Sequence, residues 1–497
     1  MEERVVTIEF NATVAGTKLD VCGANIVLGV NEIPRIELMV PPTKAKNSTP
    51  LKPNVFKPTL SDFTELYSKL SKDAENLDQT GNIDITVLTD STASGHKSDK
   101  LSLKEWVLTG VGLSSVSATS APYLSVILHH PAFWLTKVGS IYETPKTNSE
   151  NRIAEVASEG SSFLDIVEKV YEAYRGDAEV EFFESPHSDL ARVYRSQLGI
   201  GEFDPKKYMV EKEDQKLFLE NDLEGAKKSI AAAIGRMVCP MGDGSSTWDM
   251  IVRSSGYLLL DVVQNEQNNF TSKIGLVIEP SKPWRTDNIV TMPEDMCFWT
   301  EVPGMDMFKL AGVMARKLII FNNRLTTWAN SVGQRPVDDE SICDVLYCPE
   351  PPKRADGRIM KTSAPVVMQQ MAMENSVCGG NIVTGNVDAD KQILSSFDEA
   401  LSVYCKAVFE KTYGSMNSAK AQMALGFKDV NGKWILPGNT FEFMSNGKPI
   451  YYGYIRSVVH SLATKGGCST MLTMSHVRPT LTVSKVPNGN ENAAYGS

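Results

Sequence analysis

Short runs of alternating apolar and polar residues near the start of the chain predict β-strands. In the run from Ile83 to Leu88, every second residue is apolar, so one face of this strand is expected to be buried. Asn31 and Pro34 separate two other runs, which predicts a hairpin near a sheet edge. The strands predicted in this region lie at residues 5–16, 24–30, 33–40, 83–88, 101–107 and 123–128.

A helical spacing interrupts these strands. Phe63, Leu66, Tyr67 and Leu70 lie on one face at helical spacing, which predicts a short amphipathic helix, and Asp62 or Ser61 is available to cap its start. The same spacing predicts further helices, and glycine, proline and polar residues mark the loops between them. The additional predicted helices lie at residues 163–174, 226–237 and 395–412, another begins at 247–251, and loops are predicted at 41–58 and 338–352.

The β pattern returns towards the end of the chain, which makes the expected fold class α+β. Strands are predicted at residues 257–263, 421–427, 434–436, 440–444, 450–459 and 469–475, whereas residues 305–331 carry a mixed helix and strand signal. We expect two β-barrel, tube-like domains that flank and interleave with mixed α+β domains. The expected divisions are an N-terminal β-barrel at 1–150 with a helical insertion at about 41–80, a mixed α+β middle at 151–355, a helix plus second β-barrel at 356–485, and a flexible tail at 486–497.

Charge and composition restrict the class of protein. The formal net charge is −10, which argues against a general nucleic-acid binder because such proteins need clustered Lys and Arg. It leaves room for DNA that slides through a channel. No apolar run approaches the roughly 18 residues that cross a bilayer, and the acidic start Met1–Arg4 is unlike a secretory signal. We therefore expect folding in the cytoplasm, with the eight scattered cysteines reduced.

Reactive residues do not gather in any pattern typical of an active site. His129 and His130 are adjacent, so on an extended chain they point to opposite faces and cannot share a metal ion. His460 and His476 lie in the last predicted strands, where a sheet can bring them together, but no third ligand accompanies them. The sequence also lacks a metalloprotease helix, a nucleophile elbow and a P-loop. We therefore predict no catalytic, metal-binding or cofactor-binding residue and no cofactor.

Residues 436–479 carry the most informative pattern. Leu436-Pro437-Gly438 is a tight turn. A strand then runs into His460-Ser461-Leu462, a glycine loop at 466–467 follows, and a Thr-rich strand ends before Arg478. This order resembles the last barrel of the baseplate hub family of contractile phage tails, which is related to the hub part of VgrG spikes. The resemblance covers about 45 residues, and the order of elements matches more loosely over about half of the chain.

The resemblance implies a structural protein of the virion tail baseplate, assembled in the host cytoplasm and without enzymatic activity. It implies a homotrimer whose paired barrels form a pseudo-hexameric ring between the tail tube protein and the central spike protein. It further implies that the lumen holds the tape-measure protein and later passes DNA without sequence recognition. Residues 41–80, 185–245 and 338–357 depart from a minimal hub, and docking of baseplate wedge proteins is one role for them.

Other readings remain open. The chain is alternatively another tail adaptor, the hub of a bacterial contractile injection system, or an enzyme with an unfamiliar site. The Tyr-rich strand at 450–455 suits either core packing or contact between subunits, since tyrosine offers both area and a hydrogen-bonding tip. A further hypothesis is that acidic side chains such as Asp84 and Glu442 face the lumen.

Overall fold

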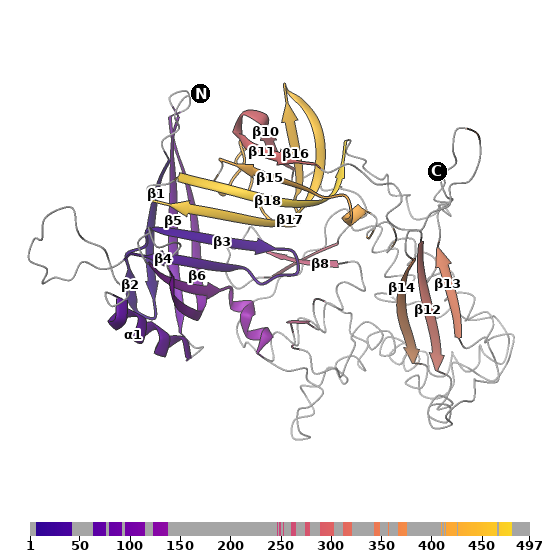
Figure 1. Ribbon diagram of the computed structural model, residues 1–497, viewed down its shortest axis with the longest axis horizontal. Coiled ribbons are helices and arrows are strands. Elements are labelled where there is room, and N and C mark those ends of the chain that lie inside the picture. The colour runs from indigo at the N-terminus through magenta and orange to yellow at the C-terminus, as the bar shows by residue number, and fades with distance from the viewer. Residues whose placement is uncertain are drawn as a thin grey trace, which may run out of the picture.

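The structure is a computed structural model, shown in Figure 1. It describes residues 6–41, 63–75, 79–91, 95–114, 123–137, 260–264, 274–278, 289–302, 312–320, 342–347, 366–374, 414–424, 426–464 and 467–479, with single residues at 246, 248, 249, 252, 356, 409 and 412. All statements below concern this part of the chain.

Most of the described residues lie in β-strands. In chain order the strands are β1 Val6–Val14, β2 Thr17–Leu19, β3 Gly23–Gly29, β4 Arg35–Val40, β5 Thr80–Ser91, β6 Gly95–Ser114, β7 Tyr123–His129, β8 Leu260–Gln264, β9 Ile274–Ile278, β10 Ile289–Pro293, β11 Cys297–Glu301, β12 Gly312–Ile320, β13 Ile342–Tyr347, β14 Val366–Glu374, β15 Ala419–Met423, β16 Thr440–Ser445, β17 Lys448–Ala463 and β18 Gly467–Arg478. The helical elements are α1 Thr64–Glu75 and the 3₁₀-helices η2 Pro131–Thr136 and η6 Glu294–Met296.

Thirteen strands form one large sheet. Its order is β11-β15-β18-β17-β3-β4-β7-β6-β5-β1-β2, with β16 beside β17 and β10 beside β16. Neighbouring strands in it are antiparallel except β10 and β16, which are parallel. We call β1 to β7 the N-terminal half and β10, β11 and β15 to β18 the C-terminal half. A three-stranded sheet, β13-β12-β14, and a two-stranded sheet, β8-β9, are separate from it.

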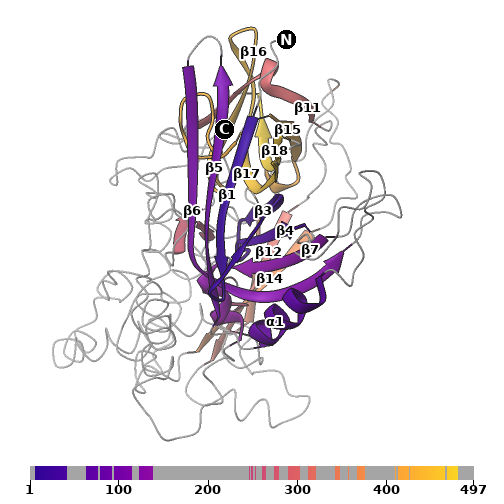
Figure 2. The same cartoon turned by 90° about the vertical axis from the view of Figure 1, so that its left-hand side faces the viewer.

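Strand β17 belongs to both halves of the large sheet. Residues 448–454 of β17 pair with β16, and residues 457–463 pair with β3 of the N-terminal half. The pairing of β17 with β18 shifts register at Ile455/Ser457, between these two stretches. Such irregularities let a strand bend and pass from one part of a sheet to another. Strand β6 is shared in a similar way within the N-terminal half: its residues 95–107 pair with β5 and its residues 107–114 pair with β7. The sheet is therefore bent and does not close (Figure 2).

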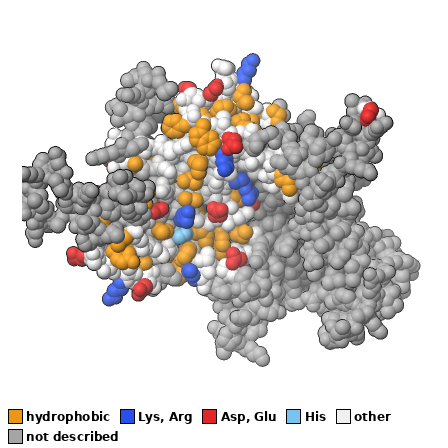
Figure 3. All heavy atoms as spheres, viewed as in Figure 1, with side chains coloured by type: hydrophobic (Ala, Val, Ile, Leu, Met, Phe, Trp, Pro, Cys, Tyr) orange, Lys and Arg blue, Asp and Glu red, His pale blue; other side chains and the backbone are white. Residues whose placement is uncertain are grey.

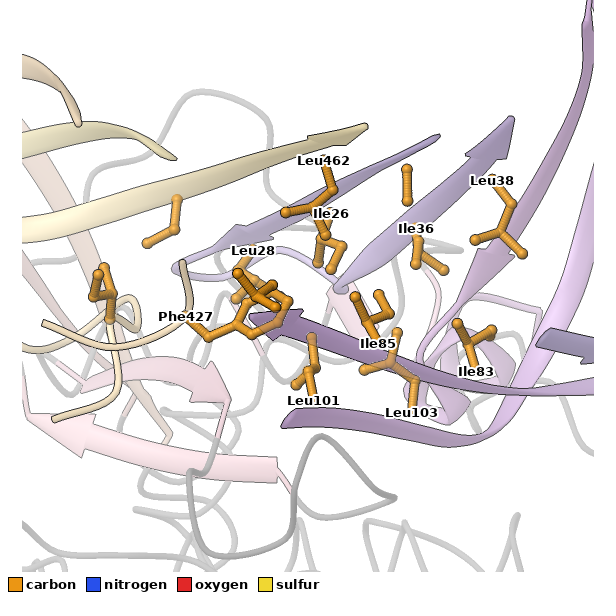
Figure 4. Close-up of a cluster of buried hydrophobic side chains, with 14 of the residues drawn as sticks. Ile26, Leu28, Ile36, Leu38, Ile83, Ile85, Leu101, Leu103, Phe427 and Leu462 are labelled. Carbon is orange, nitrogen blue, oxygen red and sulfur yellow. The ribbon is translucent and has the colours of Figure 1, made fainter. Parts of the chain in front are cut away.

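The two halves share one hydrophobic core. Alternating residues of the strands, including Ile83, Ile85 and Val87 as predicted, are buried in it. Figure 4 shows Phe427, which lies between β15 and β16, and Leu462 of β17 beside side chains of the N-terminal half. Burial of apolar surface at about 25 cal/mol per Å² makes such a joint core the main force that holds the two halves together.

The common core corrects one expectation. We predicted two β-barrels, which the described strands do not confirm: thirteen of them form one large, open sheet of mostly antiparallel strands, the others form two small sheets, and helices are few. The physical reason is the pairing of Ser457 with Gly29, which continues the N-terminal strands into the C-terminal ones. Alternation along a strand shows which face is buried but does not identify the neighbouring strand.

Most of the local predictions agree with the described elements. The hairpin of β3 and β4 and the strands β5, β7, β16, β17 and β18 lie where they were expected. Helix α1 is confirmed, with Phe63 and Leu70 buried and Leu66 and Tyr67 packed against the core.

Two local predictions were wrong. The expected loop at 338–352 contains β13, which pairs antiparallel with β12. Its sequence, Ile342-Cys343-Asp344-Val345-Leu346-Tyr347, is mainly apolar and β-branched or aromatic, which is typical of a strand. Residues 434–436 form no strand, and Trp434 and Lys428 form an isolated β-bridge. The mixed signal at 305–331 includes strand β12.

Several other predictions fall outside the described residues. These are the helices at 163–174 and 226–237, most of the helix at 395–412 and the tail at 486–497. The domain boundaries remain predictions. Among the described helices, none is long and apolar enough to cross a membrane.

Candidate functional site at the junction of the two sheet halves

A buried carboxylate marks the place where strand β8 meets both halves of the large sheet. Asp261 of β8 is 0% exposed. Its Oδ1 accepts a hydrogen bond from Asn31 Nδ2 at 2.9 Å, and its Oδ2 accepts one from the Tyr454 hydroxyl at 2.8 Å. Arg456 Nη1 lies 3.5 Å from the same Oδ2. Burial of an unpaired charge costs free energy, and these three partners offset that cost for the Asp261 carboxylate.

Asn31 ties the turn between β3 and β4 to strand β8. Its backbone N–H donates to the Val262 carbonyl, and its side-chain Oδ1 accepts from the Val262 N–H, both at 2.9 Å. Together with the bond to Asp261, one residue makes three hydrogen bonds to β8. Asn31 has φ 62°, in the left-handed region that asparagine adopts more readily than most residues. The turn therefore needs asparagine both for its backbone shape and for its amide.

Strand β17 provides the other side of the junction. The Val30 N–H donates to the Arg456 carbonyl at 2.8 Å, which continues the contact between the N-terminal turn and β17. The guanidinium carbon of Arg456 lies 6.0 Å from the centre of the Tyr454 ring, within the range of a cation–π contact. Val30, Tyr454 and Val263 of β8 form a small buried apolar cluster beside the polar groups.

The Leu436-Pro437-Gly438 turn contacts β8 as well. Gly438 has φ +91° and donates its N–H to the Ile455 carbonyl at 2.9 Å. A Cβ at this position would lie 3.1 Å from Cγ1 of Val263. Glycine is therefore required twice, by the backbone conformation and by the approach of Val263. The turn on which the sequence resemblance rests is thus part of the junction.

Replacement of Gly438 by alanine is expected to destabilise the protein by about 1–3 kcal/mol, from the left-handed backbone and the displaced Val263. Gly432→Ala is the matched control, because Gly432 has φ +79° but nothing within 4 Å of the added Cβ. Urea unfolding of both variants measures the difference. Equal losses in the two variants would show that the contact with Val263 contributes nothing.

The four histidines considered from the sequence have separate structural partners. His129 Nδ1 lies 2.7 Å from the Thr109 hydroxyl, whereas His130 accepts a hydrogen bond from the Ala132 N–H and caps η2. Desolvation, with repulsion from nearby cations, lowers the pKa of His129 to about 4. The adjacent pair therefore does not share a site, as the sequence predicted.

His460 and His476 are not brought together by the sheet. His460 is opposite Thr470, and its Nδ1 lies 2.8 Å from that hydroxyl, whereas His476 contacts the hydroxyl of Ser475 at 2.9 Å. Burial lowers the pKa of His460 to about 3. Within the described ranges, no three His, Cys, Asp or Glu residues gather as a metal site would require.

The remaining residues singled out from the sequence have local roles. Glu442 accepts a hydrogen bond from Thr291 at 3.1 Å, and Asp84 accepts one from Ser102 and lies 4.0 Å from Lys100. In the Tyr-rich strand, Tyr451 and Tyr454 are buried, which favours core packing for these two. A Cβ on neighbouring Gly453 would lie 3.2 Å from Cβ of Met474, so the close approach inferred there is present.

The junction suits a structural joint better than a reaction centre. Asp261, Asn31 and Tyr454 satisfy one another's hydrogen bonds, and the carboxylate has no exposed surface for a substrate. Our sequence analysis did not find this site. The sequence does carry one indication of the site, an isolated acidic residue within an apolar run, Leu258-Leu259-Leu260-Asp261-Val262-Val263. An acidic residue in a buried strand needs buried hydrogen-bonding partners.

Comparison with known proteins gave matches among solved structures alone. No protein-family model matches the chain, and no curated protein does. A tail protein from Neisseria meningitidis MC58 is 9% identical with a TM-score of 0.44, and the match covers 94% of this chain and 96% of that one. The 43 kDa tail protein of prophage MuSo2 from Shewanella oneidensis is 10% identical with a TM-score of 0.45, over 95% and 99% of the two chains.

A third match is a component of the type VI secretion system of E. coli, described as structurally similar to the T4 bacteriophage tail proteins gp27 and gp5. It is 10% identical with a TM-score of 0.34, over 95% of this chain and 76% of that one. The chain is therefore similar to phage tail proteins and to a type VI secretion component, with each TM-score below 0.5.

Proposed function

We propose that this chain is a structural, non-enzymatic component of a phage tail, and more specifically its baseplate hub. One observation carries the proposal. Two bent sheet halves lie in tandem in one chain, share strand β17 and bury a common core. A rigid pair of joined halves suits a subunit that must hold its shape between larger symmetric parts.

The tandem arrangement supports the hub function. Three copies, each with two halves, supply six units around a channel, which matches a hexameric tail tube on one side and a threefold spike on the other. Contacts of the head-to-tail kind close such a ring. The tape-measure protein, and later DNA, would occupy the lumen, and baseplate wedge proteins would dock outside. The chain would then act in the virion tail, after assembly in the host cytoplasm.

The chemistry of the junction supports a structural role over an enzymatic one. Its carboxylate is buried and fully engaged by Asn31, Tyr454 and Arg456, so it stabilises the joint between β8 and both halves. A general acid or base must instead reach the proton that it transfers. The alternative tail functions, an adaptor or the hub of a bacterial injection system, use the same structural properties.

The oligomeric state tests the proposal. Native mass spectrometry of the purified chain, alone and co-expressed with the spike and tube proteins of the same tail, is expected to give three times 54.6 kDa for this component. Electron microscopy of the same sample is expected to show a ring with a central channel. A monomer under both conditions would overturn the hub function.

A further inference from the structure

His460 is buried where strands β17, β18 and β3 lie side by side. It is 2% exposed and stands opposite Thr470 of β18 and Ile26 of β3. On the face that Figure 3 shows, no histidine side chain appears where Figure 1 labels β15, β17 and β18, in agreement with this burial. A histidine in such a place is uncharged, because a protein interior disfavours the imidazolium.

Hydrogen bonds define which ring nitrogen of His460 carries the proton. The Thr470 hydroxyl donates to the Gly426 carbonyl at 3.2 Å, and a hydroxyl has only one hydrogen to donate. Nδ1 of His460 lies 2.8 Å from the same hydroxyl and must therefore be the donor in that contact. The neutral ring thus has its proton on Nδ1, and a second proton can bind only at Nε2.

A compact loop packs against this histidine. We call residues 426–435 the Phe427 loop. It closes on itself, because the Ile435 N–H donates to the Phe427 carbonyl at 2.9 Å. The Phe427 ring meets the His460 ring at 80°, with the ring centres 5.1 Å apart. The first two residues of the loop therefore contact His460 and its partner Thr470.

The Phe427 loop also connects the two halves of the sheet. Phe427 is 1% exposed and lies beside Ile85 and Leu101 of the N-terminal half (Figure 4). In the C-terminal half, the Thr291 N–H of β10 donates to Oδ2 of Asp429 in the loop at 2.9 Å. Release of the loop would break this bond and remove Phe427 from the shared core. The strand pairings of β17 do not involve the loop.

The described elements around His460 offer no charge that stabilises an imidazolium there. Strands β3, β5 and β15 contribute apolar side chains to this part of the core. The titratable groups nearby are Asp99 of β6, the thiol of Cys468 in β18, and Lys428 and Asp429 of the loop. Desolvation lowers the pKa of His460 to about 3, and none of these groups contributes to the shift.

We propose that His460 is an acid-sensitive switch for the Phe427 loop: protonation at Nε2 releases the loop from the core shared by the two halves, while the strand pairings of the sheet persist. Protonation of buried histidines is a general way to open a packed contact. The closed loop is fully favoured above pH 6.5 and loses this preference as the pH falls towards 3. The inference goes beyond the proposed function and does not depend on it.

Hydrogen exchange of the Thr291 amide measures opening of the loop, because its acceptor is Asp429. After correction for the intrinsic exchange rate, the opening constant is expected to rise about 100-fold from pH 7.5 to 4.5. This factor follows from a pKa of about 6.5 in the open loop and about 3 in the closed loop. Low concentrations of urea are expected to leave this exchange unchanged, because a local opening exposes little surface. The amides of β3 and β17 are expected to exchange more slowly and to depend strongly on urea.

Two variants assign the effect to one histidine. His460→Gln is expected to reduce the rise at Thr291 to less than about threefold. His129→Gln is the matched control, since His129 also has a lowered pKa but lies outside the loop, and it is expected to keep the full rise. Asp429 is present in all three proteins, so its ionisation affects them equally.

The wild type alone decides the matter if His460→Gln does not fold. An opening constant at Thr291 that is equal at the two pH values would show that His460 does not control the loop. Exchange of Thr291 with the same urea dependence as the β3 amides would show that the loop opens only when the whole sheet unfolds. Either result would overturn the proposed switch and leave the hub function untouched.

Discussion

Replacement of Asp261 by alanine is expected to lower the free energy of unfolding by about 2–5 kcal/mol. The change leaves the Asn31 amide and the Tyr454 hydroxyl without their acceptor in a buried region, and each unpaired group costs about 1–3 kcal/mol. Arg456 contributes less, because its side chain is 34% exposed and water can replace part of the lost attraction. Equilibrium urea unfolding measures the loss.

Variants at the partner residues separate these contributions. Asp261→Asn keeps an acceptor for one partner and is expected to cost less than alanine. In a double-mutant cycle, Asn31→Ala and Asp261→Ala are expected to be non-additive, because both remove the same 2.9 Å hydrogen bond. Additive losses would contradict the role of the carboxylate as a common acceptor for the two sheet halves.

Acidification is expected to destabilise the protein through His460. Its pKa is about 3 in the folded state and about 6.5 in the unfolded chain, because burial disfavours the imidazolium. The unfolded chain therefore binds more protons between these two values. The stability that this histidine provides is fully present above pH 6.5, falls as the pH decreases towards 3, and amounts to about 5 kcal/mol when wholly lost.

Comparison with His460→Gln isolates this contribution. Between pH 6.5 and 4.5 most carboxylates stay ionised, so the stability of the wild type is expected to fall more steeply than that of the variant. His129, with a folded pKa of about 4, titrates in the same direction in both proteins and cancels in the comparison. Parallel stability curves for the two proteins would show that His460 is hydrated in the native state.

The strands were more predictable from the sequence than their arrangement. Alternation in β5 reports directly on burial, and the left-handed Gly438 follows from the Pro-Gly turn. The sequence does not indicate that β17 pairs with β3, because any strand with one apolar face can pair with another such strand. Strand β13 was missed because Asp338, Asp339 and Pro349 near it suggested a loop.

The site was less predictable for the same reason. Asp261 looks unusual in its apolar run, but its partners Asn31 and Tyr454 are distant in the sequence and ordinary in type. Their convergence depends on the order of the strands. Conversely, the histidines considered as candidate metal ligands have separate structural partners: His130 caps η2, and His460 contacts Thr470 within the sheet.

The shared strand β17 has a consequence for cooperativity. The backbone of β17 forms hydrogen bonds with β16, β18 and β3. If either half of the sheet unfolds, a strand of the other half therefore loses its hydrogen-bonded neighbour. We therefore expect the two halves to unfold as one cooperative unit instead of as two independent modules. A load applied to either half would spread through this backbone into the whole sheet.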